Sequence, residues 1–297
     1  MRPLRIVIVA LLSLALAVAL AGSATAAGVS KLVEIRAAHH PGFDRIVFEF
    51  TGPVPDVTKV TWATELRLDP SHKLAHVQGN AYLRVRFYPA VAHDQQPPMD
   101  SSFGPARRAY ALPNIAHVVL LGDFEGEVSF GIGLMKKKRI LRATTLRRPS
   151  RFVIDVATDY KKANAKVFLV DWPAVVAGEP PLTVPVERKV PRGGKANGAL
   201  LRLFAGPTRA EARKGLQFVA SGATGFRDLS VNPGGVARVT LRGPCDSGGS
   251  AVVTIANEIR RTLRRLPSID WVKIYDREGV TEQPYGKTDS IPFCLEP

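Results

Sequence analysis

Residues 44–50 read DRIVFEF and alternate between polar and apolar side chains. Ile46, Phe48 and Phe50 share one face of an extended chain, because successive side chains of a β-strand point to opposite faces. Branched and aromatic residues of this kind also favour strands. The segment therefore predicts a β-strand that buries one face, and it sets the expectation for the first half of the chain.

The same pattern recurs on both sides of this strand, with glycine, proline and aspartate between the copies. Strands are expected at residues 31–36, 44–50, 60–68, 82–88, 117–121, 127–134, 140–146 and 151–156. No helical periodicity of useful length intervenes, and residues 95–109 are expected to form an irregular loop. Short strands punctuated by turns predict an all-β sandwich or barrel over residues 28–159.

Residues 160–297 combine both periodicities. Strands are expected at residues 166–170, 229–231, 236–241 and 269–275, and helices at 197–204, 210–215 and 250–266. Residues 180–191 are rich in proline and basic side chains, and no strand is expected there. The mixture predicts a small α+β domain.

The helix expected at residues 250–266 is the longest of the chain. Ser250 is the expected N-cap, and Pro267 ends the helix. Its apolar stripe is formed by Ile255, Ile259, Leu263 and Leu266. Lying off this stripe are Arg260, Arg261, Arg264 and Arg265. Arginine binds phosphate and carboxylate groups bidentately, so these four form a candidate anion-binding patch; an ordinary solvated face is the alternative.

The N-terminus predicts a signal peptide over residues 1–27. Arg2 and Arg5 precede an apolar run at residues 6–21, and small residues at 23–27 fit a cleavage site. The run is short for a membrane span of about 20 residues, although an uncleaved anchor stays open as an alternative. No later segment is long and apolar enough to span a membrane. The protein is therefore expected to work outside the cytoplasm, with no stable membrane span after cleavage.

Two cysteines, Cys245 and Cys294, lie in the last quarter of the chain. In an exported protein such a pair is expected to form a disulfide, with two buried thiols as the alternative. The formal net charge is +15. The location outside the cell argues against nucleic acid as the partner, and the charge favours an anionic wall polymer, acidic headgroups or an acidic protein. A generally basic surface without a ligand also explains the charge.

Three stretches of the first half carry a family resemblance. They are HPGFDRIVFEFTG at residues 40–52, AHD at 92–94, and GDFEGEV at 122–128 followed by FGIGL at 130–134. Together they resemble the AMIN-like domain of exported actinobacterial proteins. The resemblance implies a β-sandwich that binds peptidoglycan, although no amidase domain follows it here. The candidate binding surface within these stretches comprises His40, Asp44, Arg45, His93 and Asp94.

The second half resembles a GerMN domain, a family that takes its name from spore-germination and sporulation proteins. The matching stretches are LFAGPT at residues 203–208, SGATG at 221–225, VARV at 236–239, the helix after residues 248–250, and WVKIY at 271–275. This resemblance implies an assembly or scaffold module of the envelope.

Residues 245–250, CDSGGS, are similar to the nucleophile motif of trypsin-like proteases. In that fold a strand follows the serine, whereas a helical pattern follows Ser247 here, and the nearest candidate base, His39, lies in the other half. Asp123, Glu125 and Glu127 crowd into one turn, which does not suit a glycosidase cleft. His39, His40 and Asp44 match no structural zinc spacing. No catalytic residue, metal site or cofactor is therefore expected.

The sequence as a whole predicts a non-catalytic, exported and wall-associated binding or scaffold protein. Its expected partner is peptidoglycan, an anionic glycopolymer of the wall or an envelope protein. Two alternatives stay open, namely an envelope hydrolase that uses Ser247 or the Asp123 cluster, and an interaction module that regulates a wall enzyme. The oligomeric state does not follow from the sequence.

Overall fold

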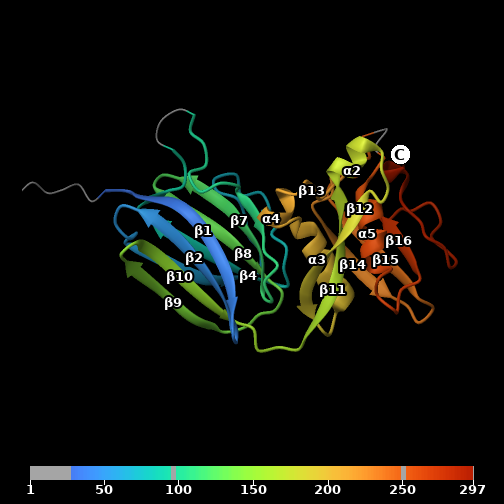
Figure 1. Ribbon diagram of the computed structural model, residues 1–297, viewed down its shortest axis with the longest axis horizontal. Helices are drawn as coiled ribbons and strands as arrows, with labels where there is room; N and C mark the ends of the chain where they lie inside the picture. The colour runs from blue at the N-terminus through green and yellow to red at the C-terminus, as the bar shows by residue number, and fades with distance from the viewer. Residues whose placement is uncertain (1–27, 95–97, 249–251, 297) are drawn as a thin grey trace, which may run out of the picture.

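The computed structural model describes residues 28–94, 98–248 and 252–296 (Figure 1). The expected signal peptide and Ser250 lie outside these residues. An all-β domain comes first, and an α+β domain follows it and packs against its side (Figure 1). Both fold classes predicted from the sequence are confirmed.

The first domain is a sandwich of two five-stranded sheets. One sheet has the order β5-β1-β2-β10-β9 and the other the order β3-β4-β8-β7-β6. The strands are β1 (Ser30–His40), β2 (Phe43–Thr51), β3 (Val57–Ala63), β4 (Ala81–Tyr88), β5 (Ala90–Val91), β6 (Arg107–Ala109), β7 (Ile115–Phe124), β8 (Glu127–Leu134), β9 (Ile140–Arg147) and β10 (Ser150–Ala157). Phe48 of β2 meets Phe87 and Phe130 of the other sheet at ring-centroid distances of 5.0 and 5.3 Å. The alternation at residues 44–50 thus places its apolar face in the core between the sheets.

Two short strands, β5 and β6, were not predicted, because two or three residues are too few for an alternation to register. The predicted strand at residues 60–68 is too long, since β3 ends at Ala63. Leu66 continues the apolar pattern beyond β3 but is buried in a separate cluster with Val119 and Leu121. Its side chain packs against β7 from a loop, so the pattern there reflects burial and not strand pairing.

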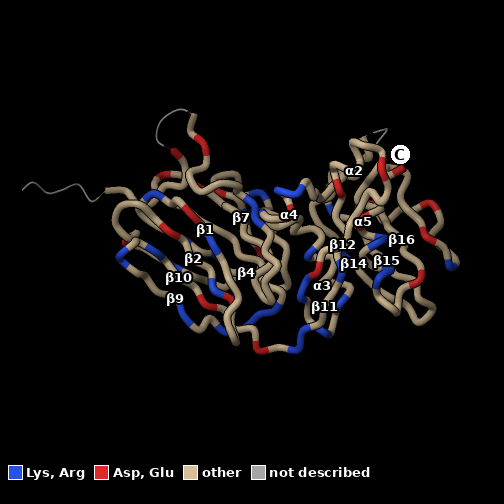
Figure 2. Tube along the Cα trace, viewed as in Figure 1, with Lys and Arg blue, Asp and Glu red and all other residues tan. Residues whose placement is uncertain are grey.

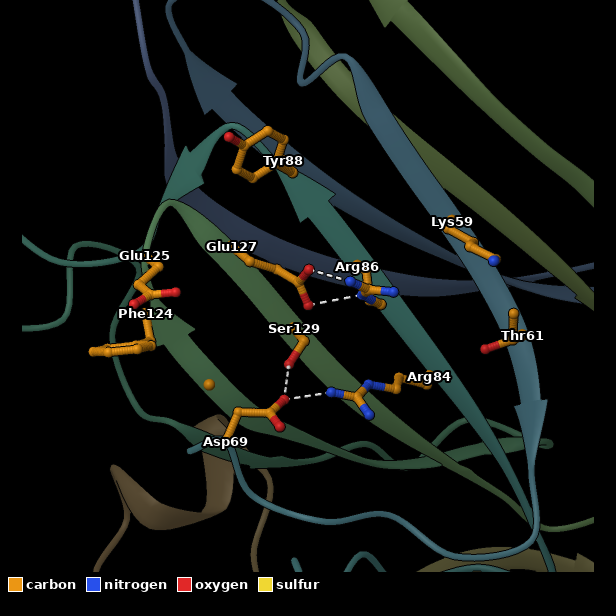
Figure 3. A pocket seen from close by; sticks show the side chains of 11 residues that line it. Lys59, Thr61, Asp69, Arg84, Arg86, Tyr88, Phe124, Glu125, Glu127 and Ser129 are labelled. Atoms are coloured by element: carbon orange, nitrogen blue, oxygen red, sulfur yellow. Dashed lines mark hydrogen bonds and ion pairs between the residues drawn. The ribbon is translucent and has the colours of Figure 1, made fainter. Parts of the chain in front are cut away.

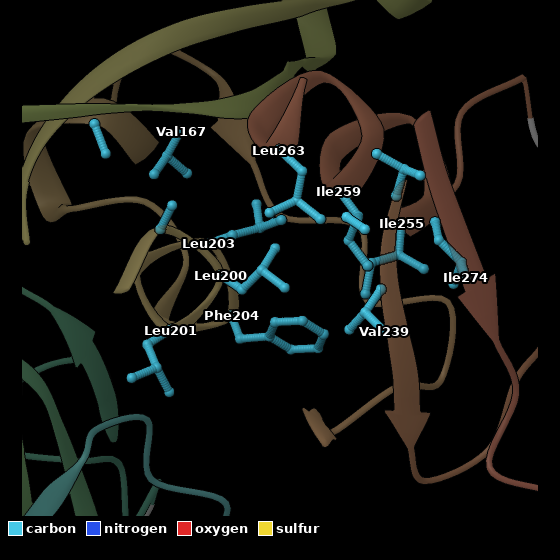
Figure 4. Close-up of a cluster of buried hydrophobic side chains, with 14 of the residues drawn as sticks. Val167, Leu200, Leu201, Leu203, Phe204, Val239, Ile255, Ile259, Leu263 and Ile274 are labelled. Carbon is cyan, nitrogen blue, oxygen red and sulfur yellow. The ribbon is translucent and has the colours of Figure 1, made fainter. Parts of the chain in front are cut away.

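The second domain holds two three-stranded sheets with two helices packed on them. The sheet orders are β12-β11-β13 and β14-β15-β16, and β15 pairs in parallel with β16. The elements are β11 (Lys162–Asp171), α2 (Trp172–Ala177), β12 (Thr183–Pro191), α3 (Lys195–Ala205), α4 (Arg209–Ala212), β13 (Leu216–Gln217), β14 (Gly225–Val231), β15 (Val236–Arg242), α5 (Ile255–Leu263), β16 (Trp271–Tyr275) and the 3₁₀ turn η1 (Phe293–Leu295). Leu200, Leu203 and Phe204 of α3 meet Ile255, Ile259 and Leu263 of α5 in one buried cluster (Figure 4).

Two sequence-based expectations for this domain are wrong. Residues 183–191 form β12, although two prolines lie within them; β12 is an edge strand, where a residue without an N–H group is tolerated. The helix expected at residues 250–266 as the longest of the chain spans only Ile255–Leu263, nine residues, whereas α3 has eleven. Thr254 caps its start in a reciprocal capping box with Asn257. Leu266, expected in its apolar stripe, is buried just beyond its end.

The disulfide between Cys245 and Cys294 is confirmed, with Cα atoms 5.6 Å apart and a sequence separation of 49. It joins the segment after β15 to the 3₁₀ turn near the C-terminus. Among the described residues, no helix is long and apolar enough to cross a membrane.

Arg202 of α3 connects the second domain to the first through hydrogen bonds. Its side chain is fully buried and donates to the carbonyl groups of Tyr110 (2.5 Å), Leu112 and Pro113 (3.2 Å) in the first domain. Within its own domain it donates to the carbonyl of Lys189. Burial lowers the pKa of Arg202 to about 10, so the guanidinium stays charged at neutral pH.

The loop that receives Arg202 is held from its other side by Asp44. One oxygen of this buried carboxylate accepts the backbone N–H groups of Asn114 (2.5 Å) and Ile115 (3.0 Å). The N–H groups at one end of the loop therefore point toward an anion, while carbonyl groups of the same loop point toward a cation. The two buried charges orient one peptide segment between them.

Replacement of Arg202 by methionine is expected to cost about 3–5 kcal/mol, because the loop carbonyls lose their buried donors. Urea unfolding should change from one transition to two as the domains separate. Arg213→Met is the control, since Arg213 is exposed and its side chain donates, among the described residues, to the carbonyl of Arg209 alone, in the adjacent helix α4. A single, unshifted transition for Arg202→Met would contradict the role given to this side chain.

Glu258 of α5 is a buried carboxyl in the core of the second domain. Its Oε2 accepts the N–H of Val219 at 3.1 Å, whereas its Oε1 has no hydrogen-bond partner among the described residues. Burial raises the pKa of Glu258 well above the ordinary value. The folded state therefore holds this proton at a pH where the unfolded chain has already lost it.

Glu258→Gln should stabilise the protein at neutral pH by about 1–3 kcal/mol, because the neutral amide removes the cost of a buried carboxylate. In the wild type, the protonated Glu258 side chain carries no ionisation penalty below about pH 4.3, the pKa of glutamate in the unfolded chain. The free energy of unfolding falls as the pH rises from there toward the pKa of Glu258 in the folded state. The two proteins should thus converge in urea titrations at pH 4. Glu179→Gln, at an exposed position, serves as the control, and an equal gain at both pH values would argue against the ionisation of Glu258 as the cause.

Candidate functional site

A hollow of about 680 Å³ lies on the outer face of the sheet formed by β3, β4, β8 and β7 (Figure 3). It is lined by Lys59, Thr61, Asp69, Arg84, Arg86, Tyr88, Gly122, Phe124, Glu125, Glu127 and Ser129. All of these belong to the first domain.

The strand alternation of β4 explains why two arginines face the hollow. Leu83, Val85 and Phe87 point into the sandwich and are fully buried, so Arg84 and Arg86 point outward. Across the sheet, Arg86 lies opposite Lys59 of β3 and Ser129 of β8, so the cation-bearing positions gather on one face.

Each arginine is held by a carboxylate. Arg86 donates to both oxygens of Glu127, and Arg84 donates to Asp69, whose carboxylate also accepts the Ser129 hydroxyl at 3.2 Å (Figure 3). Hydrogen bonds from Arg86 lower the pKa of Glu127. Gly122 permits this arrangement, since a Cβ there would lie 2.7 Å from the Cβ of Asp69.

Two aromatic rings stand at one end of the hollow. Tyr88 is 49% exposed and Phe124 is 53% exposed, which is unusual for rings of this size. They flank the turn between β7 and β8, where Glu125 and Gly126 both have positive φ, +50° and +76°. A Cβ on Gly126 would lie 3.6 Å from the Tyr88 ring, so the turn and the ring are in close contact.

The hollow offers paired hydrogen-bonding groups without a net formal charge. Three cations, Lys59, Arg84 and Arg86, face three carboxylates. Such groups present donors and acceptors to hydroxyl groups, and an aromatic ring covers an apolar ligand face. The arrangement suits a neutral, hydroxyl-rich ligand such as a sugar.

The predicted binding surface of the first domain does not assemble as one site. His40, Asp44 and Arg45 lie at the β1–β2 turn, whereas His93 and Asp94 lie beside the start of β1. The two groups are separated by about 25 Å along β1. They therefore cannot contact one small ligand together.

Asp44 in particular does not belong to any exposed surface. It is fully buried and accepts from the loop at residues 114–115 and from His39, whose Nδ1 lies 2.8 Å away. Arg45 forms a bidentate ion pair with Asp155, in which its Nε and Nη2 each lie 2.7 Å from a carboxylate oxygen. His40 stacks on Phe43. The expectation of a binding role for Asp44 is corrected to a structural one.

Ion pairs also occupy the other half of that surface. His93 bonds to Asp123 at 2.5 Å, and Lys31 bonds to Asp94 at 2.5 Å. Asp123 turns away from the hollow because Gly122 and Phe124, its neighbours in β7, face it. The predicted carboxylate cluster is thus divided, with Glu125 and Glu127 in the hollow and Asp123 outside it.

The four arginines predicted as a patch do come together. Arg260, Arg261, Arg264 and Arg265 line a second hollow, of about 520 Å³, together with Phe168 and Asp289. This hollow lies in the second domain, at the C-terminal end of α5.

Ser247 and His39 lie in different domains. His39 faces Asp44, and Ser247 lies in the segment that follows β15. Across the described parts of the chain, no group of three or more histidine, cysteine, aspartate or glutamate side chains is placed to hold a metal ion.

Most residues that line the first hollow were not predicted as site residues from the sequence, among them Lys59, Asp69, Arg84 and Tyr88. A signal was present in AYLRVRFY at residues 81–88, where two arginines occupy the outward positions of a strongly apolar strand. Asp69 gave no such signal, because it reaches the hollow from a loop.

Comparison with known families identifies both domains. Residues 30–158 match the AMIN-like domain, and residues 168–282 match the family described as sporulation and spore germination. No curated protein and no solved structure matches the chain.

Proposed function

Because the chain carries an AMIN-like domain followed by a sporulation and spore germination domain, we propose that it is an exported, non-catalytic protein of the cell envelope that binds peptidoglycan glycan in the hollow of its first domain. The two domains suggest an envelope-associated or germination-related protein. The proposal adds to this general description a ligand, peptidoglycan glycan, and a binding site.

The main support for the proposal is the pairing of charged side chains next to two exposed aromatic rings. The ion pairs of Arg86 with Glu127 and of Arg84 with Asp69 line the hollow, and the rings of Tyr88 and Phe124 lie at its edge. Binding sites commonly combine apolar ring surface with a few fixed polar groups. A sugar has the same two properties, an apolar C–H face and a rim of hydroxyls.

The charge pairing also favours binding over hydrolysis. A glycosidase needs one carboxylic acid whose pKa is raised, so that it can protonate the leaving oxygen. The hydrogen bonds from Arg86 lower the pKa of Glu127 instead. Asp69 is likewise engaged by Arg84 and Ser129.

The compartment supports the same conclusion. An AMIN-like domain suggests an extracytoplasmic location in the envelope. The disulfide between Cys245 and Cys294 is compatible with that location, since such bonds persist in oxidising compartments. Wall glycan is then a ligand that the protein encounters.

The test is retention of the purified protein on peptidoglycan sacculi stripped of anionic polymers by acid. Tyr88→Ala/Phe124→Ala should lower retention about fivefold or more, because the stacking surface is lost while the charges stay. Tyr285→Ala/Phe293→Ala is the matched control: it removes the same two residue types at positions 86% and 81% exposed, away from the hollow.

Retention of the control at the wild-type level, combined with loss in the Tyr88/Phe124 variant, supports the site. Equal retention of all three proteins removes the hollow from the proposal. Absence of wild-type retention at low salt removes peptidoglycan as the ligand.

A further inference from the structure

The hollow lined by Arg260, Arg261, Arg264 and Arg265 shares one lining residue, Arg265, with a neighbouring hollow of about 270 Å³. The neighbouring hollow is also lined by Lys166, Glu187 and Lys195. Taken together, six cationic side chains and two carboxylates line the two hollows. Figure 2 shows further lysines and arginines close to β11 and α3.

Aromatic rings and hydrogen bonds fix two of the guanidinium groups. The Arg261 guanidinium lies 5.0 Å from the centre of the Phe168 ring and donates to the Thr183 hydroxyl at 3.0 Å. Arg264 lies 5.8 Å from the centre of the Trp271 ring and pairs with Asp289 at 3.1 Å. Groups held in this way lose little side-chain entropy when a ligand binds.

The other two arginines have donors to spare. Within the described residues, neither the Arg260 nor the Arg265 side chain makes a hydrogen bond or an ion pair. Each guanidinium carries five N–H donors. Both groups are therefore available to an external anion.

Stabilisation of the helix does not account for this cluster. Cations near a helix C-terminus are favourable, but four arginines within six residues repel one another. The last turn of α5 is closed by the Arg264 backbone N–H, which donates to the Arg260 carbonyl. Among the described residues no arginine side chain of the cluster donates to an α5 carbonyl, so capping does not require them.

The surroundings favour a polymer over a lipid bilayer. None of the exposed large apolar side chains among the described residues lines either hollow. A surface without them has nothing to insert between acyl chains. Two hollows that share Arg265 suit a chain with repeated charges, and guanidinium groups bind phosphate oxygens bidentately.

We propose that the two hollows joined at Arg265 form a second binding site, specific for a linear phosphodiester polymer of the envelope. The site lies in the second domain and does not depend on the glycan hollow of the first.

The test is fluorescence anisotropy of labelled poly(glycerol phosphate) with the purified protein, at low and at physiological salt. Arg260→Gln/Arg265→Gln should weaken binding about tenfold, because two unpaired guanidinium groups are lost. Arg142→Gln/Arg147→Gln is the matched control, with the same change in net charge at two exposed positions of β9, and it should stay within about twofold.

Arg260→Lys/Arg265→Lys separates guanidinium recognition from simple charge. It should bind about threefold or more weakly than the wild type, because an ammonium cannot form the bidentate contact. Wild-type affinity in this variant, or an equal loss in the Arg142/Arg147 control, would overturn the proposal.

Two competing ligands complete the experiment. Poly-glutamate of matched length should compete about tenfold less well than the phosphodiester polymer, and equal competition would overturn the specificity for phosphate. Vesicles containing phosphatidylglycerol should bind more weakly than the polymer, and tighter binding would assign the surface to the membrane instead. Tyr88→Ala/Phe124→Ala should keep full affinity for the polymer, so that failure of the glycan site and failure of this one are distinguishable.

Discussion

One peptide segment held between two buried charges organises the molecule. The loop at residues 110–115 offers N–H groups to Asp44 on one side and carbonyl groups to Arg202 on the other. Burial of either charge alone would be costly, because each needs polar partners away from water. The loop supplies them to both, and in doing so it connects the sandwich core to α3. This contact holds the second domain against the first together with the hydrogen bonds from Gln78 to Thr224 and from Asn197 to Asn80.

Local pattern predicted the two fold classes well, because both depend on periodicity. The alternation at residues 44–50 and the apolar stripe of α5 are properties of neighbouring residues. Asp44 shows the limit. It stands between Phe43 and Arg45 at the start of the strand pattern, and no neighbour in sequence indicates that its carboxylate is buried against N–H groups seventy residues away. The start of α5 is similar, since Ser221 accepts the Asp246 N–H with its carbonyl and the Ile255 N–H with its hydroxyl, holding the approach to the helix from outside.

The candidate sites divide in the same way. The four arginines were predictable because they are close in sequence, in the last turn of α5 and in the two residues that follow it, and therefore occupy one region of space. The hollow of the first domain was not, because its floor combines β3, β4, β8 and the loop that carries Asp69. Strand pairing decides which arginine meets which carboxylate, and the sequence does not state the pairing. Sites built within one element can be read from sequence, whereas sites built across a sheet need the structure.

The disulfide has a consequence for when the second domain becomes complete. The covalent loop from Cys245 to Cys294 includes α5, β16 and Asp289. It therefore also includes Arg260, Arg261, Arg264 and Arg265. Thiols stay reduced in the cytoplasm and are joined in oxidising compartments. Under the export proposed above, the chain would leave the cytoplasm before this covalent closure forms. Oxidation outside would then be the step that completes the covalent frame around the four arginines.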